Sequence, residues 1–309
     1  MKGLQEMEIN TLISKDSKKT QIHYKILNEN FYSSIRREIT EKRLSYLSEA
    51  SKKLPLPSLF GKFTSDSHYL ATVDLFIKAT EETRNRGTFF LKQIIPSLQS
   101  YGKLLDIGPG NGMLTKWVGR KFKDITLIDP VPQVLENILP SFFSKKTALK
   151  KINQSFLQTI LPKNYFDLII LSHVIYHFPE EKWIDVVKKA LVSLKPNGIL
   201  AIVINSGLDR EKLGDNFKGK TYPIEDLILK SSQLNKKIEI FSSRESFYAK
   251  DLTTMLHICG LHLHDLKGEA VQNDLEKYIK SNYLLGEDTY KMEMFQHFII
   301  IKNDPIENY

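Results

Sequence analysis

Cysteine is nearly absent from this chain, and long apolar runs are missing. The single cysteine among 309 residues, Cys259, excludes an internal disulfide and fits a reducing compartment. No apolar run approaches the roughly 18 residues that a membrane-spanning helix needs. Residues 1–6 contain no hydrophobic signal core. We therefore expect a cytoplasmic protein without a membrane partner.

Metal-ligand spacing is also missing. Cys259 lies near His257, His262 and His264 in the sequence, but we place the cysteine in the tail of a helix and the last two histidines on a strand. No spacing typical of zinc results. We therefore predict no metal.

Positive charge is in excess. The chain has 44 lysines and arginines against 36 acids, a net charge of +8. Such an excess can indicate an acidic partner such as RNA. The lysines are scattered, however, and their short pairs alternate with acids, which favours a solvated surface. Nucleic acid stays a possible partner that the pattern does not favour.

A glycine-rich turn organises the chain. The apolar run 104–107 contains Asp106 and leads directly into Gly108-Pro109-Gly110-Asn111-Gly112, and residues 113–118 begin a helix. A strand, a glycine turn and a helix are typical of the nucleotide-binding crossover in doubly wound α/β folds. Asp129 ends the next apolar run, 23 residues after Asp106. This spacing suits an acid that binds a ribose diol.

The spacing of the glycines separates two cofactors. A dinucleotide requires GxGxxG, with helix N–H groups directed at the pyrophosphate. Here the pattern is GxGxG, and Asp106 would repel a pyrophosphate but suits a cation. In these residues the chain resembles the class I methyltransferases, whose cofactor S-adenosylmethionine carries an ammonium and a sulfonium. The alternatives are a purely structural turn and a dinucleotide site.

The remaining apolar runs predict a Rossmann-like, doubly wound sheet. Seven mostly parallel strands are expected, with an antiparallel last strand inserted beside the fifth. The third to seventh strands are placed at 150–156, 166–172, 199–204, 261–266 and 295–301. We predict a helical extension at 1–64, a methyltransferase domain at 65–309, and within it a polar insertion near the active site at 206–246.

The expected cofactor residues lie where strands end, because ligands bind there in open α/β sheets. Asp106 and the glycines should border the methionine end, and Asp129 should accept both ribose hydroxyls. Ser155 takes the place of an acid that commonly contacts adenine in such folds. The predicted cofactor-binding residues are Asp106, Gly108, Pro109, Gly110, Gly112, Asp129, Pro130, Ser155, Phe156 and Ser172.

Substrate-side candidates follow the fourth strand. A histidine at this edge can take a proton near neutral pH, and Tyr176 can present its ring to a cation. Packing explains each of them equally well. These candidates are His173 and Tyr176, predicted to be catalytic and to bind the substrate, and His177, predicted to bind it.

A closer resemblance is to histamine N-methyltransferase and its relatives. It rests on residues 69–82, Ile128-Asp129-Pro130, residues 172–176, residues 203–207 and residues 251–261. The resemblance implies that Glu82, or its neighbour Glu81, binds a substrate ammonium. His173 stands where the family has a glutamine that contacts the substrate ring, and Met294 falls near the place of a family asparagine. A small amine or imidazole acceptor is therefore expected. With the resemblance included, the predicted catalytic residues are His173, Glu82 and Tyr176, and the predicted substrate-binding residues are Tyr69, Glu82, His173, Tyr176 and His177.

Two other functions remain open. An RNA or protein methyltransferase would suit the basic charge, but the Asn/Asp-Pro-Pro-aromatic turn of enzymes that methylate exocyclic base amines is replaced by Leu171-Ser172-His173-Val174. A regulatory protein could also bind the cofactor without turnover. The first predicts salt-dependent RNA binding, and the second predicts cofactor binding without methyl transfer.

Overall fold

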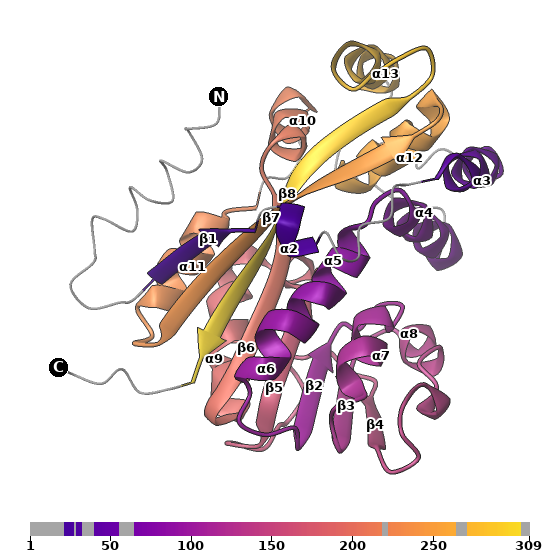
Figure 1. Ribbon diagram of the computed structural model, residues 1–309. Coiled ribbons are helices and arrows are strands. Elements are labelled where there is room, and N and C mark those ends of the chain that lie inside the picture. The colour runs from indigo at the N-terminus through magenta and orange to yellow at the C-terminus, as the bar shows by residue number, and fades with distance from the viewer. Residues whose placement is uncertain are drawn as a thin grey trace.

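The computed structural model describes residues 22–27, 29–32, 40–55, 65–217, 222–263 and 271–303. Its centre is a sheet that contains eight strands within these residues (Figure 1). All of these strands run parallel except β8, which is antiparallel to both of its neighbours. The strand order is β1 (Ile22–Ile26), β7 (Lys237–Ala249), β8 (Tyr290–Lys302), β6 (Leu194–Ser206), β5 (Phe166–Ser172), β2 (Lys103–Ile107), β3 (Asp124–Ile128) and β4 (Ala148–Ile152).

The predicted fold class is confirmed, including the last strand inserted beside the fifth, since β8 lies between β6 and β7. The count differs by one, because β1 joins the edge of the sheet through β7. This strand belongs to the segment predicted to be helical. In the described part of that segment, β1 is followed by the short helix α2 (Glu29–Tyr32) and then by α3 (Glu41–Ser51).

The prediction of a strand at 261–266 is wrong for its first residues. Helix α12 (Leu252–His262) continues through Leu261, and residues 264–266 lie outside the described residues. On the side of β8 away from β6, the neighbouring strand is β7. Residues 237–246 of β7 fall in the predicted insertion. Burial alternates along most of β7, which is the pattern of a strand with one face covered.

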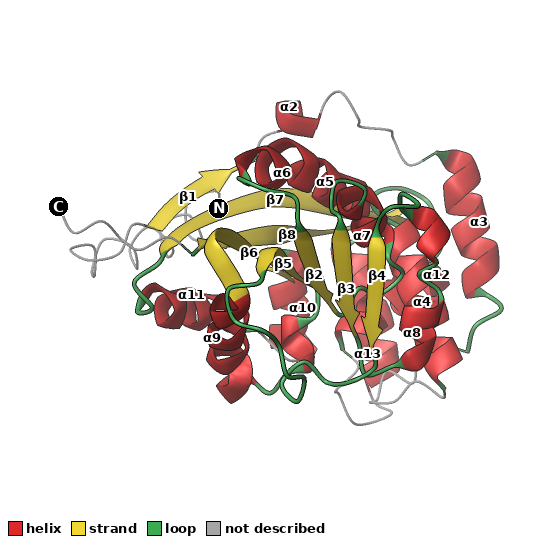
Figure 2. Cartoon of the chain, turned by 90° about the horizontal axis from the view of Figure 1, so that it is seen from below, coloured by secondary structure: helices red, strands yellow, loops and turns green. Residues whose placement is uncertain are grey.

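Helices cover both faces of the sheet (Figure 2). On one face, a continuous helical segment and α7 (Met113–Gly119) bury Phe89, Phe90 and Val118 against the sheet. On the other face, α9 (Trp183–Ser193) and α11 (Ile224–Ser232) do the same with Trp183 and Leu227. The helical segment consists of α5 (Glu82–Phe89), a π-helical turn at Phe90–Ile94 and α6 (Ile95–Ser97).

Strands β7 and β8 extend beyond the parallel strands, and a third apolar cluster surrounds their far halves (Figure 1). This cluster includes Leu47 of α3, Leu75 of α4, Met255 of α12 and Ile279 of α13. The remaining α-helices of the described residues are α4 (Asp66–Lys78), α8 (Pro132–Glu136), α10 (Asp209–Phe217) and α13 (Val271–Asn282). Among the described residues, no helix is both long and apolar enough to cross a bilayer.

Two polar side chains fix the starts of helices and strands. Ser65 caps α4 by accepting the His68 N–H at 3.2 Å. Asp167 is structural: it accepts the Lys103 N–H at 2.7 Å and the Lys195 ammonium at 2.8 Å, which joins the starts of β2, β5 and β6. Hydrogen bonds from Lys195 and Ser100 lower the pKa of Asp167 despite its burial.

Candidate active site

The glycine turn is closed on two sides and open on the third. Gly108, Gly110 and Gly112 have positive φ values of 64°, 55° and 69°, which favour glycine. A Cβ on Gly108 would lie 2.4 Å from Val174 Cγ2, and one on Gly112 would lie 2.6 Å from Ile138 Cγ1. A Cβ on Gly110 would meet nothing within 4 Å. The backbone around Gly110 is therefore available to a ligand.

The two predicted acids lie close to one another. Asp106 is 2% exposed and accepts the Thr115 hydroxyl at 2.5 Å. Burial raises the pKa of Asp106 to about 7, and the negative charge of Asp129 contributes to this increase. Asp129 follows the end of β3 and accepts the Val131 N–H at 2.8 Å. Burial also raises its pKa, and its charge in turn raises the pKa of Tyr69 on α4.

The loops that follow β3 and β4 are joined at this edge. The Asn153 amide donates to the carbonyl oxygens of Asp129 and Pro130, at 3.1 and 3.0 Å. Ser155 is half-buried beside them. Phe156 is an exception among the predicted cofactor residues, because its side chain is 2% exposed and packs in the hydrophobic core. Its ring therefore does not face a ligand.

After β5 the chain turns sharply. His173 has a φ of 56°, in the left-handed region, and its N–H donates to the Val203 carbonyl at 2.9 Å. Strained backbone at a strand end is a feature of functional sites. Tyr176 follows in the 3-10 turn Ile175–His177, with its ring 6.5 Å from the His173 ring. His177 is exposed beyond Tyr176.

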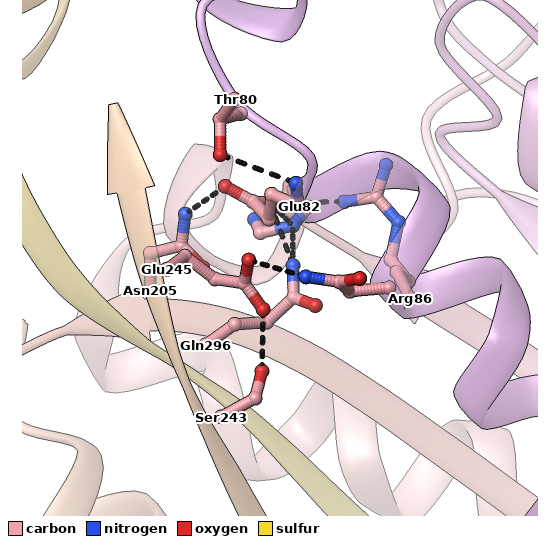
Figure 3. A network of polar contacts seen from close by, with 9 residues as sticks. Thr80, Glu82, Arg86, Asn205, Ser243, Glu245 and Gln296 are labelled. Carbon is pink, nitrogen blue, oxygen red and sulfur yellow. Dashed lines mark hydrogen bonds and ion pairs between the residues drawn. The ribbon is translucent and has the colours of Figure 1, made fainter. Parts of the chain in front are cut away.

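Glu82 occupies the centre of a buried polar network (Figure 3). It begins α5, and its side chain is 4% exposed. Oε1 accepts Gln296 at 2.6 Å and Arg86 at 3.2 Å, whereas Oε2 accepts Asn205 at 2.9 Å. The third group at Oε1 is His173 Nε2, at 2.8 Å. Desolvation is outweighed by the interactions with His173, Arg86 and Asn205, which lower the pKa of Glu82 to about 2.

Sheet register brings the amides of this network together. Asn205 and Gln296 are direct partners across β6 and β8, and Ser243 of β7 is the next partner in the same row. Ser243 donates to Glu245 Oε1 at 2.7 Å, and Asn85 of α5 donates to Oε2 at 2.8 Å. Burial raises the pKa of Glu245 to about 7. Helix α5 and three strands therefore hold the two carboxylates in fixed positions.

The Glu82 contact determines the form of the His173 ring. Burial and the positive charge of Arg86 lower the pKa of His173 more than Glu82 raises it, so the ring is neutral at pH 7. We assign the proton to Nε2, because this atom faces a carboxylate that can only accept. Nδ1 then carries a lone pair, and it forms no hydrogen bond with any described residue.

Several site residues were missed by the sequence analysis. Arg86 and Glu245 gave no signal, because a charged residue in a polar segment looks like surface. Arg86 is 9% exposed, and its Nε has no hydrogen-bond partner in the described part of the chain. Arg210 and Tyr222 lie in the predicted insertion and contact one another, with the guanidinium 4.4 Å from the ring centre. Their proximity to Tyr176 appears only once the chain is folded.

The family model described as methyltransferase domain matches residues 79–245. The N-terminal Xaa-Pro-Lys N-methyltransferase 1-A of Xenopus laevis is 29% identical over 131 residues, which cover 41% of this chain and 57% of that protein. The chain thus spans little more than half of that relative. No group of three or more histidine, cysteine or acidic residues that could hold a metal occurs among the described residues.

Two solved structures share the fold. A Bacillus halodurans protein assigned as a methyltransferase gives a TM-score of 0.53 at 14% identity, over 68% of this chain and 96% of that one. The YcgJ protein of Bacillus subtilis gives 0.51 at 10% identity, over 72% and 99%. The closer resemblance to histamine N-methyltransferase stays a prediction. Because the family model covers more than half of its residues, the chain belongs to the methyltransferase-domain family, as a class I enzyme dependent on S-adenosylmethionine.

Proposed function

We propose that this enzyme methylates a nitrogen of a small amine or imidazole. The observation that carries the proposal is the contact between His173 Nε2 and the buried Glu82 carboxylate, at 2.8 Å. This pair lies at the edge where β5 ends, beside the glycine turn. A neutral histidine held by an ionised carboxylate is suited to accept a proton from a nitrogen nucleophile.

The residues around the turn fit the cofactor. The open backbone at Gly110 leaves room where a Cβ would project. Asp106 is suited to the ammonium, and Asp129 to the ribose hydroxyls. The unpartnered, buried Nε of Arg86 is suited to the carboxylate. When bound, the cofactor supplies a methyl group activated by a sulfonium.

His173 would act as the general base. A nitrogen acceptor needs a free lone pair to accept the methyl group from sulfur. The acceptor nitrogen loses its proton to His173 Nδ1, while Nε2–H remains donated to Glu82. Such proton transfer by a positioned side chain contributes about 10²–10⁴-fold to rate. Alignment of the acceptor and exclusion of water supply a further several kcal/mol.

We propose a role for Glu82 that differs from the one that the resemblance implied. Three protein groups already converge on its Oε1 and a fourth binds Oε2, which supports contacts within the protein rather than with a substrate ammonium. We propose that Glu82 is a positioning residue that fixes the His173 ring. Tyr69 and Tyr176 are then the candidates for contact with a cationic acceptor, through their aromatic faces.

The test is a methyl-transfer screen with labelled cofactor. The acceptors are imidazoles, primary amines, carboxylates, RNA and a peptide beginning Xaa-Pro-Lys, the last because of the Xenopus relative. We expect transfer to small amines or imidazoles, and a loss of at least 100-fold in His173→Asn. His23→Asn, on the exposed edge strand β1, is the matched control and should retain activity.

Two results would contradict the proposal. The first is transfer only to RNA, only to carboxylates or only to the peptide. The second is cofactor binding without transfer to any acceptor, which would indicate a regulatory protein.

A further inference from the structure

Helix α10 (Asp209–Phe217) starts at the same edge of the sheet as the active site, directly after β6 (Figure 1). The connection has two successive positive φ values, 73° at Gly207 and 52° at Leu208, and the second is strained. A bulky residue such as leucine is rarely found in this conformation. The start of α10 is therefore held in a defined position after a tight turn.

Asp209 fixes that position by its contacts with the rest of the fold. Its carboxylate accepts the Glu293 N–H of β8 at 2.8 Å. Its carbonyl oxygen accepts the Tyr283 hydroxyl at 3.2 Å. The next residue, Arg210, is consequently directed by a backbone that is anchored on two sides.

Arg210 is a buried cation that no carboxylate of the described residues contacts in an ion pair. Its relative exposure is 5%. The charge of the adjacent Glu211 acts on it, and its side-chain hydrogen bond is with Tyr222. The nearest aromatic contact is with Tyr222, whose ring centre lies 4.4 Å from the guanidinium carbon. Burying an unpaired charge costs several kcal/mol, and arginine does not escape this cost by losing its proton. Such a residue is expected to meet an anion.

The position of Arg210 is on the acceptor side of the site. Tyr222 stacks on Tyr176, with ring centres 5.2 Å apart and planes inclined by 21°. The Tyr176 ring in turn lies 6.5 Å from the His173 ring. Arg86, by contrast, forms an ion pair with Glu82, and the groups of Tyr176 and Asp106 also act on it. The two buried arginines therefore differ, because only Arg86 is paired with a carboxylate of the described residues.

We propose that Arg210 binds an anionic group of the methyl acceptor, so that the substrate is an amine or imidazole that also carries a carboxylate or a phosphate. This inference rests on the proposed function. The planar guanidinium presents paired N–H donors that match the oxygens of either anion. The rings of Tyr222 and Tyr176 form a chain of contacts from this cation to His173, which places Arg210 on the acceptor side of the site.

The experiment compares acceptors in matched pairs. Histidine and histamine differ by a carboxylate, and phosphoethanolamine and ethanolamine differ by a phosphate. The wild-type enzyme should prefer the anionic member of one pair by at least tenfold in kcat/KM, and the pair affected identifies the anion. In Arg210→Gln, kcat/KM for that member should fall by about 10–100-fold. For its neutral counterpart it should change less than threefold.

Two control variants address folding and charge. Arg120→Gln removes an exposed arginine at the end of α7 and should leave kcat/KM unchanged for both members of the pair. Arg210→Lys keeps the charge but loses the paired donors, so its loss should be intermediate and confined to the anionic member. Calorimetry with S-adenosylhomocysteine should give the same affinity in Arg210→Gln as in wild type, which shows that the cofactor side is intact.

The outcomes separate this inference from the proposed function. Equal losses for both members in Arg210→Gln and Arg210→Lys, or a wild-type preference for neutral amines, would overturn the anion site and leave amine methylation standing. No transfer to any member of either pair, nor to other amines and imidazoles, would overturn the proposed function and the anion site with it.

Discussion

Replacing Glu82 by glutamine keeps the shape of the side chain and removes its charge. In the structure the carboxylate fixes His173 at 2.8 Å and neutralises Arg86 at 3.2 Å. The pKa of Glu82, about 2 against an ordinary 4.5, corresponds to about 3 kcal/mol in favour of the ionised form. The amide of glutamine is uncharged, so the electrostatic interaction with His173 and Arg86 is lost. Its N–H groups can also rotate toward His173 and displace the proton from Nε2.

The expected effects follow from these contacts. Without the carboxylate, either ring nitrogen of His173 can carry the proton, and a base held in the wrong form loses about 10²–10³-fold in kcat/KM. Glu82 raises the pKa of His173, so its removal should move the acidic limb of the pH–rate profile to lower pH. Arg86 becomes an unpaired buried charge, which costs about 3–5 kcal/mol and lowers Tm by about 5 °C.

The assay is kcat/KM against pH, with thermal melting to monitor folding. The matched control is Glu81→Gln, which removes a carboxylate one position earlier that pairs with Arg43 and Arg84. This control should retain the wild-type pH profile. Activity of Glu82→Gln within threefold of wild type, with an unmoved acidic limb, would refute the assignment of His173 and Glu82 as a catalytic pair.

Four further substitutions test other parts of the site. Because the pKa of Asp106 is raised to about 7, affinity for S-adenosylhomocysteine should increase from pH 6 to pH 8, and Asp106→Asn should abolish this dependence in calorimetry. Gly112→Ala should destabilise the fold by about 1–3 kcal/mol in denaturant titration, since its Cβ meets Ile138. Gly110→Ala, which faces open space, should instead weaken cofactor binding. The raised pKa of Glu245, about 7 against 4.5, means that the native state binds more protons, so stability should fall by up to about 3 kcal/mol as pH rises through this window. Glu245→Gln should flatten that fall, and a melting curve series with the wild-type slope would contradict the burial argument.

The parallel half of the fold could be predicted because its signals are local. Strand β5 is a continuous apolar run, and the glycine turn follows β2 without an intervening residue. Strand β7 was missed for a physical reason. Its buried face includes Ser243 and Glu245, which are stabilised by a hydrogen bond between them and by one from the distant Asn85 to Glu245 rather than by apolar packing. A hydrophobic pattern cannot reveal such a face.

The site shows the same division. Asp106, Asp129 and His173 were identified because each directly follows or ends a strand of recognisable pattern. Asn205 and Gln296 were not, since they reach Glu82 across 123 and 214 residues of chain. Their convergence depends on the register of β6 and β8, and register is a property of the folded sheet.

The charges of the site argue for an acceptor with an acidic group. On the cofactor side, Arg86 is balanced by Glu82, and Asp106 can lose its proton when a cation approaches. On the acceptor side, Arg210 forms no ion pair with the described residues, and its guanidinium lies against the Tyr222 ring. An acceptor that brings only an amine would add positive charge beside this arginine, whereas one that also brings a carboxylate or phosphate would neutralise it. Repulsion of simple amines by Arg210 should therefore contribute to selectivity, and Arg210→Gln should bind them no worse than the wild type.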